Sequence, residues 1–237
     1  MNMNKTKIII MLILRILCII LFPLSYVFDP TYSGNLTFFT VQSNIFVLLI
    51  MLTESIFDIL MLTGKIDKLP KFLSKIKLVS TTSISITFIV FGIILTPVLI
   101  KEGLPEIVTS YSSIVMHQII PIVAIIDLIL NKPTEKISYG YTPLALTFPL
   151  YYYIFTLIVP LFGIHFKAYE NGETVMSNFP YFFLDYEKNG WLRFDGEYMG
   201  VIYWLIIIIL FELLVSAFYI FIKNLQFKKQ VYKKQTE

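Results

Sequence analysis

Six long apolar segments alternate with short polar stretches along the 237-residue chain. The apolar core of a bilayer requires roughly 20 residues in helical form, and each segment reaches that length. We predict membrane-spanning helices at about 8–28, 38–62, 78–100, 109–130, 142–164 and 201–222. The predicted fold class is therefore all-α: a polytopic membrane protein with a single six-helix transmembrane domain over residues 1–237.

Most lysine residues of the predicted loops lie beside the same end of the predicted helices. They lie between the second and third segments, after the fourth and beyond the sixth, at 65–77, 132–136 and 223–234. Most acidic loop residues follow the opposite helix ends. Because cytoplasmic loops carry the excess of Lys and Arg, we predict that both termini are cytoplasmic. We expect a multi-pass protein of the cell membrane, in a bacterial plasma membrane, with the first segment kept as an uncleaved anchor.

The loop at 165–200 is the longest predicted piece outside the membrane, and it is rich in aromatic residues. They are Phe166, Tyr169, Phe179, Tyr181, Phe182, Phe183, Tyr186 and Trp191. A freely solvated loop does not need such side chains, whereas aromatic rings are favoured at the membrane interface. We expect this loop to pack as a re-entrant or interfacial cap over the outer end of the bundle.

Composition narrows the classes of function. Hydrophobic residues make up 57% of the chain and charged residues 15%, which is typical of a membrane protein. With one cysteine and two histidines, we expect neither an intramolecular disulfide nor a Cys- or His-based metal centre. The sequence has no nucleotide-binding loop and no nucleic-acid-binding patch. We therefore expect no cofactor and no nucleic-acid partner, but membrane lipid, with an acyl-chain substrate if the protein is an enzyme.

Polar residues in the second and fourth segments form a predicted outer layer. They are Thr40, Gln42, Ser43, Asn44 and His117. Such groups often serve only as interhelical hydrogen bonds. Alternatively, Thr40 or Ser43 is a nucleophile whose proton His117 removes, while neighbouring amides and hydroxyls stabilise an oxyanion. His165, near the end of the fifth segment, is expected to be an interfacial histidine.

Ionisable residues form a second, inner layer in the predicted bundle. They are Arg15, Glu54, Asp58, Asp127 and Glu212. Buried charges persist when they are paired, so the favoured interpretation is that Arg15 pairs with Asp58 or Asp127 and holds helices together. The alternative is a proton or cation path, in which case the protein is a small transporter, channel-like protein or sensor.

Three short motifs resemble a known family. They are Phe38-Phe39-Thr40 at the start of the second segment, Met116-His117 followed by Pro121 in the fourth, and Tyr181-Phe182-Phe183-Leu184-Asp185 in the outer loop. This arrangement resembles the androgen-induced and androgen-dependent membrane hydrolases. The stretch from Phe39 to Asn44 is also similar to a Phe-Thr-x-Gln-Ser-Asn signature in bacterial and fungal integral membrane proteins.

The resemblance implies a threonine hydrolase in the membrane, with Thr40 as nucleophile and His117 as base. The animal members of this hydrolase family cleave lipid esters, notably fatty acids esterified to hydroxy fatty acids. Tyr181 and Asp185 then join Gln42 and its neighbours as candidate substrate-binding or oxyanion residues. The leading hypothesis is an integral membrane hydrolase or acyl-transfer enzyme that acts on a lipid ester.

Overall fold

The computed structural model describes residues 5–29, 36–67, 69–131, 133–170, 173–196 and 198–236. Within these residues, six helical segments are long and apolar enough to cross a membrane. They are Lys5–Phe28, Phe39–Leu62, Lys71–Lys101, Tyr111–Leu130, Tyr139–Phe162 and Val201–Lys233. The predicted all-α polytopic membrane fold is confirmed.

Three of the six segments are single α-helices and three are composite. The single helices are α1 (Lys5–Phe28), α2 (Phe39–Leu62) and α10 (Val201–Thr236). The third span consists of α3 (Lys71–Val90), η1 (Phe91–Leu95) and α4 (Thr96–Lys101). The fourth consists of α6 (Tyr111–Ile114), η2 (Val115–Ile119) and α7 (Ile120–Leu130). The fifth consists of η3 (Tyr139–Leu146), α8 (Thr147–Ile158) and η4 (Val159–Phe162). The short helix α5 (Pro105–Thr109) links the third segment to the fourth.

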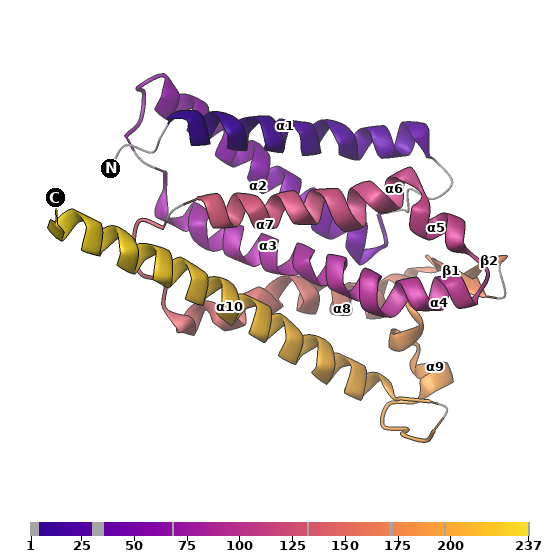
Figure 1. Ribbon diagram of the computed structural model, residues 1–237. Helices are drawn as coiled ribbons and strands as arrows, with labels where there is room; N and C mark the ends of the chain where they lie inside the picture. Colours follow the sequence, from indigo (N-terminus) through magenta and orange to yellow (C-terminus); the bar gives the residue numbers. More distant parts are fainter. Residues whose placement is uncertain are drawn as a thin grey trace.

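Helix α1 begins and helix α10 ends at the same end of the bundle (Figure 1), and we call it the termini end. The opposite end carries two short strands and helix α9 (Tyr186–Asn189), and we call it the hairpin end. Because α2 begins at the hairpin end, Thr40 lies close to it.

Helix α3 occupies the centre of the bundle and packs against α2, α7 and α10. This helix itself carries a run of small polar side chains, all of them buried. They are Ser80, Thr81, Thr82, Ser83, Ser85 and Thr87. Small residues let helices approach closely in a membrane, and several of these hydroxyls bond back to their own helix, as Thr82 does to the carbonyl of Leu78 at 2.8 Å. Their polarity is therefore satisfied within the bundle.

Two helices extend further toward the termini end than the apolar runs predict. The third span starts at Lys71 rather than near residue 78, and α10 continues through the lysine-rich tail. Lys77, expected in a loop, consequently lies inside α3 and is 3% exposed. A lysine can occupy this position because its aliphatic stem packs along apolar surface and its ammonium is paired.

Two proline residues explain the two π-helical turns, η1 and η2. A proline ring clashes with the carbonyl four residues earlier and removes one backbone hydrogen bond. For Pro97 that carbonyl belongs to Ile93, inside η1, and for Pro121 it belongs to His117, inside η2. A single π turn accommodates such a break and is frequent at functional sites.

The loop at the hairpin end contains regular structure that the sequence pattern did not predict. Strand β1 (Phe166–Glu170) pairs antiparallel with β2 (Glu173–Ser177), with Phe166 opposite Ser177. The turn η5 (Phe182–Leu184) follows, and Phe183 packs against Val201 and neighbouring apolar residues of the third span and α10. Aromatic residues of this loop thus cover the hairpin end of the bundle.

Gly200 holds this covering loop against the start of α10. Its N–H donates to the Arg193 carbonyl at 2.7 Å, and a Cβ at this position would lie 2.5 Å from the carbonyl oxygen of Trp191. We expect Gly200→Ala to lower the free energy of unfolding by about 1–3 kcal/mol, as overpacking does. Thermal unfolding in detergent measures this. Gly196→Ala is the matched control, since its added Cβ meets no atom within 4 Å; equal melting temperatures for the two variants would contradict the proposed clash.

Candidate functional site

Thr40 and His117, on different spans, meet at the hairpin end of the bundle. Thr40 is the second residue of α2 and His117 lies in η2; Thr40 Oγ1 is 3.2 Å from His117 Nε2. The other ring nitrogen, Nδ1, lies 3.1 Å from the Ser113 carbonyl oxygen. A carbonyl can only accept, so Nδ1 carries the proton and Nε2 presents its lone pair to the Thr40 hydroxyl. This is the tautomer that a general base requires.

Stacking fixes the plane of the His117 ring. The ring of Phe91 lies parallel to it, with a centroid distance of 3.7 Å and an interplanar angle of 14°. Phe91 begins the π turn η1, and His117 lies in the π turn η2. The two breaks caused by Pro97 and Pro121 therefore occur where the imidazole is held.

Tyr181 joins this pair from the covering loop. Its hydroxyl lies close to the Thr40 side chain, to the backbone N–H groups of Phe39 and Thr40, and to the Tyr152 side chain. These N–H groups belong to the first turn of α2 and have no acceptor within the helix. Burial raises the pKa of Tyr181 to about 12, so its hydroxyl keeps its proton at neutral pH. Tyr152 in turn donates to the Thr37 carbonyl at 2.9 Å.

The structure separates the two candidate nucleophiles. Ser43 Oγ is fully buried and hydrogen-bonds to the Thr40 carbonyl at 3.0 Å and to Thr87 Oγ1 at 2.9 Å. It faces α3 and neither cavity described below. Thr40, by contrast, faces an imidazole and open space. The geometry favours Thr40.

The amides next to Thr40 do not point toward its hydroxyl. Gln42 Nε2 donates to the Leu36 carbonyl at 2.8 Å. Asn44 Nδ2 donates to the carbonyls of Thr40 and Met116, at 2.7 and 3.0 Å, and so ties α2 to η2. Both amides are engaged with backbone carbonyls, whereas Tyr181, a member of the same predicted set, lies beside Thr40.

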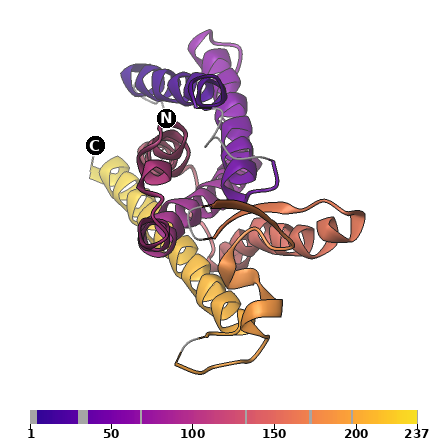
Figure 2. The same ribbon diagram turned by 90° about the vertical axis from the view of Figure 1, so that its right-hand side faces the viewer.

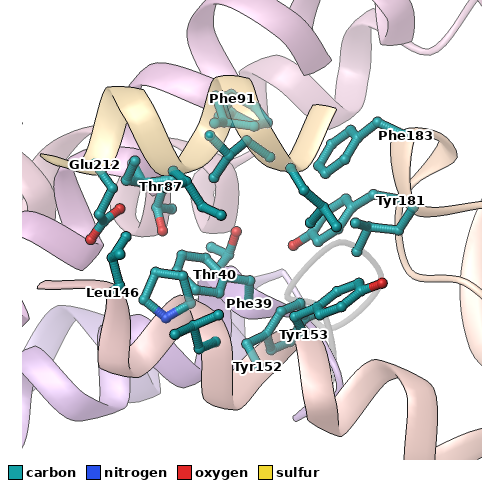
Figure 3. A pocket seen from close by; sticks show the side chains of 18 of the residues that line it. Phe39, Thr40, Thr87, Phe91, Leu146, Tyr152, Tyr153, Tyr181, Phe183 and Glu212 are labelled. Atoms are coloured by element: carbon teal, nitrogen blue, oxygen red, sulfur yellow. The ribbon is translucent and has the colours of Figure 1, made fainter. Parts of the chain in front are cut away.

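Two cavities meet at Thr40. The first, of about 190 Å³, is lined almost wholly by apolar and aromatic side chains, and we call it the apolar cavity. The second, of about 680 Å³, opens at the hairpin end and contains His117 in its wall. Charged side chains such as Lys101, Glu102 and Asp185 line it together with apolar ones, and we call it the polar cavity. Thr40, Phe91, Leu95 and Tyr181 line both. Figure 3 shows the apolar cavity with the Thr40 hydroxyl at its centre.

The apolar cavity lies between two spans that diverge. Figure 2, which looks onto the hairpin end, shows α8 and α10 splayed apart. Leu150 of α8 and Leu205 and Ile208 of α10 line the cavity. Leu150 is 47% exposed, so one wall of the cavity reaches the lipid-facing surface of the bundle.

The remaining predicted residues of this region, Asp185 and His165, have other hydrogen-bond partners. Asp185 accepts from the backbone N–H of Lys188 at 2.9 Å, caps α9 and lines the polar cavity. His165 Nδ1 lies 3.0 Å from Asn178 Oδ1. His165 is exposed and lines neither cavity.

The inner layer is an ion-pair cluster centred on Arg15. Its guanidinium contacts Asp127 through two bonds of 2.8 and 2.9 Å and Asp58 through one of 2.7 Å. Glu54 lies 3.2 Å from the same guanidinium. Lys77 bridges Glu54 and Asp127 at 2.7 and 2.8 Å. Arg15 thus pairs with both predicted partners rather than with one of them.

Lys223 is a further basic residue near this cluster. Its ammonium donates to the carbonyls of Leu128 and Asn131, and it interacts electrostatically with the acids of the cluster. Arg15 and Lys77 are therefore ion-paired with three carboxylates, and Lys223 lies close by. Glu212, predicted to belong to this layer, lies instead in the wall of the apolar cavity. That position corrects the sequence-based grouping.

Sequence reasoning missed several members of both sites. They are Lys77 and Lys223 in the ion-pair cluster, and Phe91, Ser113 and Tyr152 around the Thr40–His117 pair. Two signals pointed to these regions: the run of Ser and Thr over 80–87, and the two prolines inside predicted spans. Neither signal says which side chains meet.

Fold and composition define the class as an integral, multi-pass helical membrane protein. Comparison of the chain with protein-family models, with curated proteins and with solved structures found no match.

Proposed function

We propose that this protein is a membrane-embedded hydrolase or acyl-transfer enzyme that acts on a lipid ester, with Thr40 as nucleophile and His117 as general base. The observation that carries the proposal is the 3.2 Å contact between Thr40 Oγ1 and His117 Nε2 at the junction of an apolar and a polar cavity. The resemblance of the Thr40, His117 and Tyr181 motifs to the androgen-induced and androgen-dependent membrane hydrolases supports the same reaction class.

The reaction proceeds in two displacements. Thr40 Oγ attacks the ester carbonyl carbon while His117 Nε2 accepts the hydroxyl proton. The tetrahedral intermediate collapses, the ester C–O bond breaks, and the proton passes from Nε2 to the departing alcohol. Water, or another alcohol in acyl transfer, then gives its proton to Nε2 and attacks the acyl-threonine. The C–O bond to Thr40 breaks, the proton returns to Thr40 Oγ, and the acid or new ester is released.

Tyr181 is the proposed oxyanion donor. Its hydroxyl lies beside Thr40 and keeps its proton, and the adjacent N–H groups of Phe39 and Thr40 begin a helix whose dipole favours negative charge there. The imidazolium formed at His117 is stabilised through Nδ1–H and the Ser113 carbonyl. No carboxylate is required in this arrangement.

The two cavities suggest where the two parts of a lipid substrate bind. The acyl chain occupies the apolar cavity, reached from the bilayer between α8 and α10, and each buried methylene contributes about 0.8 kcal/mol. The polar part of the lipid and the attacking water occupy the polar cavity. From the lysine bias we propose that this cavity faces the outer side of a cell membrane and that the termini are cytoplasmic.

An activity probe tests the nucleophile directly. We expect a fluorophosphonate to label the wild-type protein in membranes and to fail with Thr40→Ala, because the probe reacts with activated hydroxyls. Ser43→Ala is the matched control: it lies one turn away in the same helix and should still be labelled. In-gel fluorescence reads out both. A labelled Thr40→Ala, or an unlabelled wild type that is folded, would reject the assignment.

The alternative function, a transporter, channel-like protein or sensor, was based on the acidic inner layer as a proton or cation path. A path of this kind needs ionisable groups that are open to water. Glu54, Asp58 and Asp127 are each at most 1% exposed and ion-paired, which favours a role in helix packing. Ion uptake by proteoliposomes that Asp58→Asn abolishes would reverse this preference.

A further inference from the structure

Glu212 is a buried carboxyl group without a partner. It lies on α10, is fully buried, and neither of its carboxyl oxygens has a hydrogen-bond partner among the described residues. It lines the apolar cavity together with Thr40. In Figure 3, Glu212 stands at one end of this lining and Tyr181 at the other, with Thr40 between them.

Among the described residues, no neighbour hydrogen-bonds to the Glu212 carboxyl group. Tyr219, which interacts with it electrostatically, has its hydroxyl bonded to Ser85 Oγ at 2.7 Å. Ser216, one turn along α10, also has a buried hydroxyl without a partner among the described residues. An unpaired ionised carboxylate in an apolar site is very costly, so the neutral acid is the form that this cavity can hold. A neutral carboxyl group has one O–H donor and a carbonyl acceptor.

We propose that Glu212 is a specificity-determining residue that binds an oxygen substituent, a free hydroxyl or keto group, part-way along the acyl chain in the apolar cavity. This inference rests on the proposed function, in which that cavity holds the acyl chain and the ester lies at Thr40. The substituent is separate from the ester oxygens. A hydroxyl or keto oxygen matches the donor and acceptor of a carboxylic acid, whereas an ammonium would leave donors unsatisfied among the apolar walls.

Binding of free acids tests this without requiring turnover. The probes are octadecanoic acid and a series of hydroxy- and keto-octadecanoic acids with the oxygen at successive positions, competing with a fluorescent fatty acid on the protein in nanodiscs. We expect one narrow range of positions to bind wild type about tenfold more tightly than octadecanoic acid, the effect of one buried hydrogen bond. Equal affinity across the whole series would overturn the proposal.

Two variants assign the preference to Glu212. Glu212→Leu should bind octadecanoic acid at least as well as wild type and lose the positional preference, while Glu212→Gln, which keeps a donor and an acceptor, should retain most of it. Glu212→Leu removes an unpaired buried polar group, so it should melt no lower than wild type. A preference that persists in Glu212→Leu would overturn the proposal.

A second readout separates this inference from the proposed function. The infrared difference spectrum between wild type and Glu212→Gln should contain the carbonyl stretch of a protonated carboxylic acid, which shifts when the oxygenated acid binds. Position-selective binding by a protein that no fluorophosphonate labels would reject the hydrolase and keep the Glu212 site. Labelling of Thr40 without any positional preference in binding would keep the hydrolase and reject the Glu212 site.

Discussion

His117→Ala is expected to lower the rate of lipid-ester hydrolysis by about a hundred- to ten-thousand-fold, the usual contribution of a general base. Thr40 would lose the acceptor for its proton, because the only imidazole nitrogen beside its Oγ1 in the described structure is Nε2 at 3.2 Å. Hydrolysis of a fluorogenic lipid ester by the protein in nanodiscs measures the effect. The apolar cavity does not include His117, so binding of the acyl chain should change little.

The control for this prediction is the other histidine. His165→Ala removes an exposed imidazole bonded to Asn178 and should leave turnover within about twofold of wild type, since surface substitutions have small effects. Both variants should melt close to wild type. If His117→Ala hydrolyses the ester at the wild-type rate, the Thr40–His117 mechanism is wrong.

Arg15→Met is expected to lower the free energy of unfolding by about 3–5 kcal/mol, the typical effect of removing one partner of a buried ion pair. The substitution leaves Asp58 without its 2.7 Å partner and takes two bonds from Asp127 in a region with no access to water. Thermal unfolding in detergent, followed by the amount of monodisperse protein that remains, measures the loss.

An exposed ion pair provides the comparison. Lys71 and Glu135 are 2.8 Å apart, with exposed fractions of 73% and 41%, so Lys71→Met should cost at most about 1 kcal/mol. The double variant Arg15→Met, Asp58→Asn should be more stable than Arg15→Met alone, because the neutral amide at position 58 leaves no unpaired buried carboxylate there. Equal melting of Arg15→Met and Lys71→Met would show that the cluster does not hold the helices together.

The sequence predicted the spans well where apolar length alone decides them. The second span was expected at 38–62 and is Phe39–Leu62. The third was misjudged at its start, because Lys77 interrupts the apolar run although it lies inside the helix. The rule that charge marks a loop fails when an acid on another helix neutralises the lysine, and that acid is distant in sequence.

The candidate site was predictable in its residue types but not in its contacts. Thr40 and His117 stood out because polar groups are rare in a bilayer. That they touch, that Ser43 turns to α3 and that Tyr181 supplies a hydroxyl depend on the rotation of each helix. Rotation follows from packing between spans, which a single chain's hydrophobic pattern does not specify.

The sequence by itself determined that this is a six-span membrane protein, because the length and apolarity of each span are local properties that the bilayer demands. Tertiary structure decided which polar groups meet. It grouped Arg15 with three acids and Lys77, and it placed Glu212 in an apolar cavity where neither carboxyl oxygen has a partner among the described residues. The physical reason is that each buried polar group is stabilised by partners on other helices, and only their packing brings those partners within hydrogen-bonding distance.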